Sequence, residues 1–368
     1  MITRRKFIQS SAILSTTLLT NLSASTTTLK KEWFMPDESE PHKRTWMAFI
    51  ANDYIWERKQ IPIVKQDLAR IAQTIAKYEP VNMLISPREI NEAKKLLGRQ
   101  HNFPIKLIPF ETDDLWLRDT APTFVVNEVG EKACINFNFN GWGEDQEHSL
   151  DKHVANFIAK EAKVDIISTD LVLEGGCFEV DGEGNALMTE SCIVNENRNP
   201  YKLKKEIDQE MKKLLGLEKI IWLKGIKGED ITDGHTDFYA RFVSSNALIV
   251  SQENDKASHE YDITRDNIKV LSNASNFKGE LFNLHILKTP SKINPIGNEN
   301  DFAAGYIGYY LCNNAVILQK FGDKKADKKA YKTLAKLFPE RTIEQIAING
   351  IASGGGSIHC ATQQEPKI

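Results

Sequence analysis

The stretch D-L-W-L-R-D (Asp114–Asp119) places carboxylates and a tryptophan between two β-rich runs, PIKLIPF from Pro104 and PTFVV from Pro122. Charged runs are usually solvated loops. The apolar residues around Trp116 indicate instead a partly buried loop, where carboxylates need a cationic partner. Arg118 is one candidate for that partner, and a bound cation is the other.

Unusual polar loops of this kind recur along the chain, at Glu174–Gly176, Thr232–Asp237 and Gly354–Cys360. They are separated by 55 residues from Asp119 to Glu174, by 61 to His235, and by 125, about twice that period, to Cys360. A regular period near this length is typical of a propeller or an array of supersecondary units, and the chain length then allows about five or six units. One repeat lacks an obvious signature, and we assign it to the loop at Gly297–Asp301.

Helical and β-rich segments alternate between these loops, which predicts an α/β fold. If the units close into a ring, equivalent loops meet at its axis. A doubly wound α/β sheet, whose active loops also gather at strand ends, is the alternative. Apolar residues at three- and four-residue spacing predict helices over Arg58–Tyr78, His148–Lys163, Pro200–Leu215, His259–Leu271 and Lys328–Phe338. The other predicted strands are VNMLIS from Val81, CINFNF from Cys134, KIIWLK from Lys219, NALIVS from Asn246 and AVILQKFG from Ala315.

Composition narrows the class of partner. The 368 residues are 41% hydrophobic, and 47 basic and 50 acidic residues give a net charge of -3. Because these charges are interspersed, we expect neither nucleic acid nor an anionic membrane as a partner. The five cysteines lack the short spacings of a disulfide framework or a zinc ribbon, and their odd number leaves at least one free thiol. Four of them fall in apolar, strand-like segments.

The N-terminus reads T-R-R-K-F-I-Q from Thr3, followed by the weakly apolar SAILSTTLL and small residues. This layout resembles a twin-arginine export signal, with cleavage near Ser23–Ser25. The apolar run is about half the roughly 20 residues that a membrane anchor needs. We therefore expect a leader over residues 1–30, a single catalytic domain over 31–368, and a periplasmic location. A basic tail with adjacent arginines by chance, and a cytoplasmic protein, is the alternative.

The segment G-G-G-S-I-H-C-A-T-Q-Q (Gly354–Gln364) begins with three glycines, which permit close approaches that a Cβ would block. A phosphate-binding loop is excluded because no Lys-Ser or Lys-Thr follows the glycines. Taken alone, Cys360 fits an inert buried cysteine or a nucleophile.

His235 and Asp237 stand two residues apart in T-D-G-H-T-D, so on a strand both would face one ligand. A cysteine beside a histidine is a recurrent arrangement for nucleophilic catalysis, because the thiolate attacks while the imidazole moves protons. A metal site formed by His235, Asp237, His359 and Cys360 is the alternative. It is disfavoured because neighbours such as His359 and Cys360 rarely reach one tetrahedral ion.

The segment L-V-L-E-G-G-C-F-E-V (Leu171–Val180) is predicted to be a strand that two glycines interrupt, next to an acid. Such glycines commonly mark a bulge or a close backbone approach. Glu174 would then lie at a strand end, either capping a turn or facing the site.

In combination, these strings resemble the agmatine deiminase family, relatives of bacterial peptidyl-arginine deiminase. The likeness extends over Met35–Pro366. In family order it comprises M-P-D-E-S-E-P-H with T-W-M-A, W-L-R-D-T-A-P-T-F-V, F-N-G-W-G, L-E-G-G, N-R-N-P, T-D-G-H-T-D and G-G-G-S-I-H-C-A-T-Q-Q-E-P. The resemblance implies the pentein fold, a five-bladed pseudosymmetric α/β propeller of ββαβ units with its active site on the axis. It also implies that no metal or other cofactor is needed.

The resemblance further implies a role for each candidate residue. Cys360 is the nucleophile, His235 the general acid and base, and Glu174 the carboxylate that orients His235. Asp119 and Asp237 hold the planar guanidinium through paired hydrogen bonds. A thiolate beside two aspartates is electrostatically disfavoured, so we expect the bound cation itself to promote ionisation of Cys360.

The implied substrate is a small cationic guanidine, most simply agmatine, hydrolysed through a Cys360 thiouronium to N-carbamoylputrescine and ammonia. Trp116, Trp142 and Asp114 are further candidates for substrate contact, although core packing explains the tryptophans equally well. One departure is Ile231, where the family pattern has an acid. Arginine or peptidyl-arginine is therefore an alternative substrate, and a guanidine-binding protein without catalysis is an alternative function. The likeness also suggests a homodimer.

Overall fold

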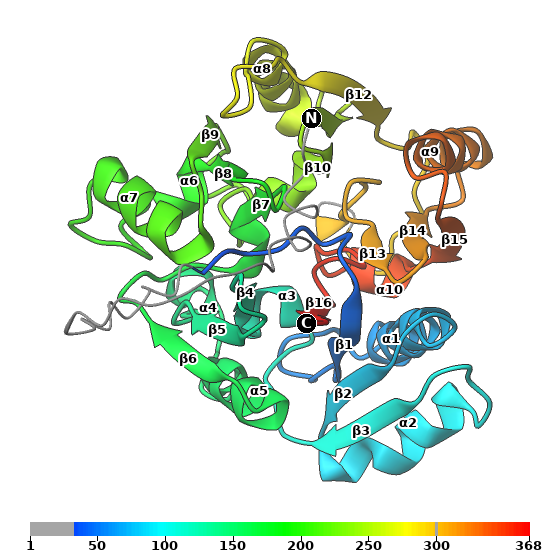
Figure 1. Cartoon of the computed structure of the whole chain (residues 1–368). Coiled ribbons are helices and arrows are strands. Elements are labelled where there is room, and N and C mark those ends of the chain that lie inside the picture. The colour runs from blue at the N-terminus through cyan, green and yellow to red at the C-terminus, as the bar shows by residue number, and fades with distance from the viewer. Residues whose placement is uncertain (1–32, 299–300) are drawn as a thin grey trace, which may run out of the picture. The chain divides into compact units, whose positions relative to one another are not determined.

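Small mixed sheets surround a common centre in the computed structural model, which describes residues 33–298 and 301–368 (Figure 1). There are five such sheets in this part of the chain. In four of them an antiparallel hairpin is followed by a helix and then by a strand parallel to the second hairpin strand. The predicted five-bladed arrangement of ββαβ units is thus confirmed, and the doubly wound sheet is wrong.

These four blades follow one another along the chain. Their strands are β4 (Thr123–Val126), β5 (Lys132–Asn136) and β6 (Asp165–Ser168); β7 (Phe178–Val180), β8 (Asn185–Thr189) and β9 (Lys219–Leu223); β10 (Ala240–Ser244), β11 (Ala247–Gln252) and β12 (Asn283–Lys288); and β13 (Tyr310–Cys312), β14 (Ala315–Lys320) and β15 (Thr342–Ala347).

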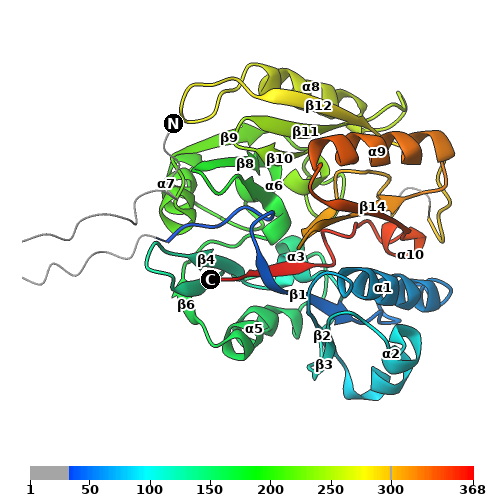
Figure 2. The same cartoon turned by 45° about the vertical axis from the view of Figure 1, so that its right-hand side comes forward.

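The remaining blade joins the first and last strands of the described chain. Its strands, in spatial order, are β16 (Gln363–Pro366), β1 (His42–Phe49), β2 (Val81–Ile85) and β3 (Ile105–Pro109). The C-terminal strand β16 pairs antiparallel with β1, and Figure 2 shows the two side by side. This pairing closes the ring, so the residues just before β16 lie at the centre.

The amphipathic helices α2, α5, α7, α8 and α9 lie on the outer rim in Figure 1, whereas the short helices α3 and α10 lie nearer the centre. In α1, another amphipathic helix, Val64, Leu68, Ile71 and Ile75 are buried at helical spacing. The helices are α1 (Ile61–Ile75), α2 (Ile90–Leu97), α3 (Leu117–Thr120), α4 (Gly141–Glu144), α5 (Val154–Ala162), α6 (Glu190–Ile193), α7 (Lys204–Leu215), α8 (Glu260–Ser272), α9 (Lys324–Leu337) and α10 (Asn349–Ala352), with 3-10 turns η2 (Pro87–Glu89), η3 (Asp151–His153), η4 (Gly175–Cys177) and η5 (Thr236–Phe238).

The five helices predicted from periodicity are all present, and so are the predicted strands. Two local predictions are wrong. Leu171–Val180 is not one strand, because β7 begins only at Phe178 after the 3-10 turn η4. His235 and Asp237 lie at a second 3-10 turn, η5, instead of on a strand. In both places the chain forms a 3-10 turn directly after the predicted site residue, Glu174 or His235.

The cysteine prediction is half right. Cys134 and Cys312 lie in strands β5 and β13, whereas Cys177 lies in η4 and Cys192 in α6. All five cysteines are buried free thiols.

The predicted export signal, residues 1–30, lies outside the described residues. Contacts group the described part of the chain into one compact unit. No helix within residues 33–298 and 301–368 has the length and apolar character required to span a membrane.

Candidate active site

The predicted site residues come from the loops that enter the first hairpin strand of successive blades. Asp119 in α3 precedes β4, Glu174 precedes η4 and β7, His235 precedes η5 and β10, and Cys360 precedes β16. Because each of these hairpins points its leading end at the centre, residues far apart in sequence meet there (Figure 1).

The fifth loop is the connection from β12 to β13, in which the predicted segment Gly297–Asp301 falls. Residues 299–300 of the predicted segment Gly297–Asp301 lie outside the described residues, and the segment that directly precedes β13 is 305–309. This loop contributes a backbone contact to the segment before Cys360, because the His359 N–H donates to the Gly308 carbonyl at 3.0 Å. A Cβ on Gly308 would lie 2.1 Å from Ser357 Oγ, so only glycine fits. Without a reactive side chain, this repeat was invisible in the sequence.

The glycines before Cys360 were predicted to permit close approaches, and the groups that pack against them are tryptophans. A Cβ on Gly354 would lie 2.0 Å from the Trp56 ring, and one on Gly356 would lie 2.0 Å from the Trp116 ring. The predicted substrate contact Asp114 is also part of this packing. Its carboxylate accepts hydrogen bonds from Trp56 Nε1 at 2.8 Å and from Gln146 Nε2 at 3.2 Å. These contacts fix the loop that carries Cys360.

Cys360 is 6% exposed, and its Sγ lies 3.9 Å from Asp237 Oδ2 and 3.2 Å from Ser357 Oγ. Its carbonyl accepts the backbone N–H of Arg118 at 3.0 Å, which ties the nucleophile loop to the loop of Asp119. Burial, then the charges of Asp237 and Asp119, raise the pKa of Cys360 well above that of an ordinary thiol. The free protein therefore holds Cys360 as a thiol.

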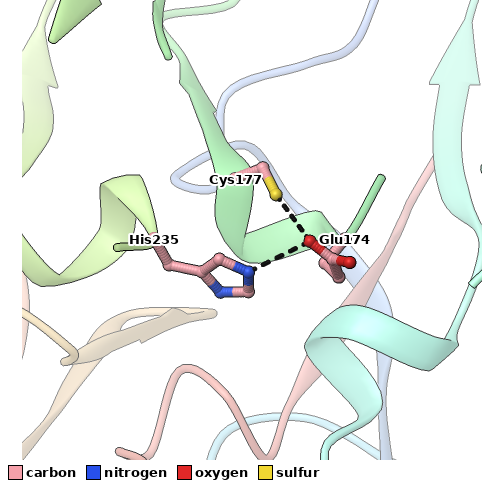
Figure 3. A group of neighbouring side chains, drawn as sticks. All are labelled: Glu174, Cys177 and His235. Carbon is pink, nitrogen blue, oxygen red and sulfur yellow. Dashed lines mark hydrogen bonds and ion pairs between the residues drawn. The ribbon is translucent and has the colours of Figure 1, made fainter. Parts of the chain in front are cut away.

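Figure 3 shows His235 and Cys177 directed at the same carboxylate, that of Glu174. Glu174 Oε2 lies 3.2 Å from His235 Nε2 and 2.9 Å from Cys177 Sγ. On its other nitrogen, His235 Nδ1 lies 3.9 Å from Asp119 Oδ1. Burial opposes protonation of His235, but the carboxylates of Asp119 and Glu174 raise its pKa well above the usual value. His235 is therefore an imidazolium, ready to donate a proton.

Sequence reasoning missed Arg198, which lies in the N-R-N-P string and was given no role. Its Nε donates to both oxygens of Glu174, at 2.9 and 3.1 Å, and its Nη1 donates to Asp233 at 2.7 Å. Burial opposes the charge on Glu174, but the His235 hydrogen bond and then the Arg198 charge lower its pKa to about 2. The signal that could have identified Arg198 is its place as a single cation between two asparagines, directly before a proline.

Asp119 is held from both sides. Its Oδ2 accepts Trp142 Nε1 and its Oδ1 accepts the Gly176 N–H, both at 3.1 Å. Trp142 itself adopts a left-handed backbone, with φ 55° and ψ 45°. Such a conformation costs energy in a bulky residue and persists where the surroundings enforce it. The predicted Trp142 thus lies next to Asp119 and hydrogen-bonds it.

Asp237 is 1% exposed and only half satisfied. Its Oδ2 lies 2.7 Å from His359 Nδ1, whereas Oδ1 has no hydrogen-bond partner among the described residues. Burial, although opposed by His235, raises the pKa of Asp237 to about 7. An unpartnered buried carboxylate oxygen is costly, and a cationic ligand with N–H donors would remove that cost.

The four ligands of the metal alternative do not form the group that converges. Within the described part of the chain, the side chains whose ligand atoms meet are Glu174, Cys177 and His235. Glu174 already binds the Arg198 guanidinium, and burial raises the pKa of the Cys177 thiol well above its usual value. A cation next to an arginine and a neutral thiol is unfavourable, so this cluster fits orientation of His235 better than metal binding.

The arrangement suits attack on a planar cation. Two carboxylates, one with a free oxygen, lie beside a thiol, and an imidazolium fixed by Glu174 and Arg198 supplies a proton. Ile231, where the family pattern has an acid, is 42% exposed in the loop before His235.

Comparison with known proteins gives extensive matches. The family described as Porphyromonas-type peptidyl-arginine deiminase matches residues 34–366. A putative agmatine deiminase of Legionella pneumophila is 34% identical over 337 residues, which cover 91% of this chain and 95% of that protein. An agmatine deiminase of Medicago truncatula is 33% identical over 367 residues, with coverage of 91% and 96%. The structure of Enterococcus faecalis agmatine deiminase, described as catalysing its reaction, superposes with a TM-score of 0.84 at 29% identity, covering 91% of this chain and 96% of that one.

Proposed function

The chain belongs to the Porphyromonas-type peptidyl-arginine deiminase family, and from this premise we propose that it is an agmatine deiminase. Its similarity to agmatine deiminases over most of its length identifies it as a guanidine-modifying hydrolase. The proposed reaction converts agmatine and water into N-carbamoylputrescine and ammonia. The observation that carries the proposal is the contact between two buried side chains, Cys360 and Asp237. The Oδ1 atom of Asp237 has no hydrogen-bond partner among the described residues.

Binding begins with the guanidinium between Asp119 and Asp237. Two carboxylates bind its N–H groups and fix its plane, and charge-assisted hydrogen bonds of this kind contribute about 1.5 to 3 kcal/mol each. The ligand's positive charge also offsets the two negative charges that raise the pKa of Cys360. Cys360 then releases its proton to solvent water and becomes a thiolate beside the electrophilic carbon.

The thiolate adds to the guanidinium carbon, forming a C–S bond and a tetrahedral adduct. The imidazolium of His235 protonates one NH2 group, whose C–N bond breaks to release ammonia. A thiouronium on Cys360 remains. Glu174, ionised because its pKa is about 2, stabilises His235 as the proton donor before this step.

Water completes the reaction. Neutral His235 removes a proton from water, whose oxygen attacks the thiouronium carbon. The C–S bond breaks, and the proton that remains on the attacking oxygen passes to the departing sulfur, which restores the Cys360 thiol. The product is a ureido group, and His235 is again an imidazolium.

The test is an ammonia-release screen over agmatine, arginine, short arginine peptides and methylguanidines. We expect agmatine to give the highest kcat/KM. Preferred turnover of arginine peptides would reject agmatine while retaining guanidine hydrolysis, and no turnover of any guanidine would reject the deiminase.

We also propose that residues 1–30 export the folded protein to the periplasm and that the mature enzyme is a homodimer. The support is the Arg4-Arg5 pair with its short apolar run and the family likeness. Cell fractionation and size-exclusion chromatography with light scattering test these two proposals separately.

A further inference from the structure

His359 stands directly before the nucleophile but has no part in the reaction as derived. It is 2% exposed, and its Nδ1 lies 2.7 Å from Asp237 Oδ2. An ionised carboxylate has no proton to donate and can only accept hydrogen bonds. When Asp237 is ionised, the proton of this contact is therefore on His359 Nδ1. The backbone N–H of His359 donates to the Gly308 carbonyl, which fixes the backbone from which the imidazole extends.

A buried group of charges surrounds the far side of the ring. His359 Nε2 lies 3.4 Å from Glu38 Oε2 and 3.7 Å from Glu179 Oε1. Arg241 binds both glutamates, with its Nε 2.6 Å from Glu179 Oε1. Arg118 also reaches Glu38, at 3.4 Å, and the Gln364 side chain, at 2.8 Å. These contacts confine the imidazole on the side away from Asp237.

We propose that His359 is a positioning residue: its Nδ1–H holds Asp237 Oδ2 and so leaves the other oxygen, Oδ1, for the guanidinium of the substrate. The inference rests on the proposed function and adds a specific residue to it. Among the described residues, the side-chain contacts of Asp237, with His359 and more distantly with Cys360, are on Oδ2, and Oδ1 has none, which is the division that this role requires.

The alternative orientation of Asp237 explains why such a residue is needed. Oδ2 is also the oxygen that lies 3.9 Å from Cys360 Sγ. Without the His359 contact, the carboxylate is free to rotate, and the thiol becomes its nearest donor. His359 thus keeps the protein contacts of Asp237 on Oδ2 and leaves Oδ1 as a ligand for the substrate.

The contact also affects the pH range in which Asp237 is charged. Hydrogen bonds to an ionised carboxylate favour that form, so loss of the Nδ1–H contact raises the pKa of Asp237 above about 7. Burial, followed by the charges of Arg118 and Arg241, lowers the pKa of His359 well below its usual value, so the ring remains a neutral donor. The titratable and charged groups that face this pair are Glu38, Arg118, Asp119, Glu179, His235, Arg241 and Cys360.

Two amide variants separate positioning from packing. Asn places an N–H donor near the position of Nδ1, whereas Gln places it near Nε2. We therefore expect His359→Asn to keep a KM for agmatine within about threefold of the unaltered enzyme. We expect His359→Gln to raise KM on the order of 10- to 100-fold, as for loss of one charge-assisted contact. The acid limb of kcat/KM should move to higher pH in His359→Gln and stay in place in His359→Asn.

A binding arm keeps the test independent of turnover. Each His359 variant is combined with Cys360→Ala, and binding of agmatine and of guanidinium chloride is measured by calorimetry. Weaker binding in His359→Gln than in His359→Asn supports the proposal even if agmatine is not turned over, an outcome that would reject only the proposed substrate. Equal binding and equal acid limbs in the Asn and Gln variants would overturn the proposal, as would a folded His359→Leu variant with unchanged KM.

Discussion

Replacement of Arg198 by methionine would leave Glu174 buried without its cation. Arg198 Nε contacts both Glu174 oxygens, at 2.9 and 3.1 Å, and Glu174 is 0% exposed. Methionine keeps much of the volume of the side chain but donates no hydrogen bond. The variant therefore tests how far this ion pair supports both the fold and His235.

The magnitude follows from the pKa of Glu174, which falls from 4.5 to about 2 in the folded protein. That difference corresponds to about 3 kcal/mol, shared with the His235 hydrogen bond. Removal of one partner from a buried pair typically costs about 3 to 5 kcal/mol, which agrees. Because the folded pKa is lowered, this stability is present above about pH 4.5 and is lost as pH falls toward 2.

The assay is urea unfolding at pH 7, followed by tryptophan fluorescence, together with kcat for agmatine. We expect Arg198→Met to lose about 3 kcal/mol of unfolding free energy and at least about tenfold in kcat. Arg198→Lys, which keeps the charge without the paired contact, should lose less. The control Lys278→Met breaks an exposed pair with Glu183, both about half exposed, and should cost less than about 1 kcal/mol. A loss below about 1 kcal/mol in Arg198→Met with unchanged kcat would refute the reasoning.

Further predictions concern the nucleophile, the carboxylates and the leader. Cys360→Ala should abolish ammonia release but retain agmatine binding by calorimetry, because both carboxylates remain; full turnover would contradict the mechanism. Asp119→Asn should weaken that binding on the order of 10-fold or more, since one charge-assisted contact is lost. The kcat/KM should fall as pH drops below about 7, where Asp237 becomes protonated, and a flat profile down to pH 5 would contradict this. Arg4→Lys with Arg5→Lys should retain the protein in the cytoplasm on fractionation, and export of this variant would count against the signal.

Features with a regular pattern were predictable from the sequence. The helices were found because their apolar residues recur on one face, as in α1 with Val64, Leu68 and Ile71. The ring was predicted from the spacing of reactive loops, and the site residues from the strings that carry them. The short helix α2 (Ile90–Leu97) was missed because only Ala93 and Leu97 of its eight residues are buried.

Contacts between residues far apart in sequence were not predictable, because nothing local encodes them. Arg198 binds Glu174, 24 residues away, and Asp233, 35 residues away. Gly308 is needed because of Ser357, which follows in the next blade. His359 was considered only as a metal ligand, since its partner Asp237 is 122 residues away and becomes its neighbour only in the closed ring.

The charges at the centre explain why binding of the substrate is coupled to ionisation of Cys360. Asp119 and Asp237 both carry raised pKa values from burial, and together they raise that of Cys360. Without a ligand, Cys360 therefore keeps its proton, so a permanently reactive thiolate is avoided. A guanidinium changes this balance because it brings one positive charge and several N–H donors into the site. A neutral urea, the product group, brings no charge. Release of product therefore restores the protonated thiol, and Cys360 becomes reactive again only when the next cation binds.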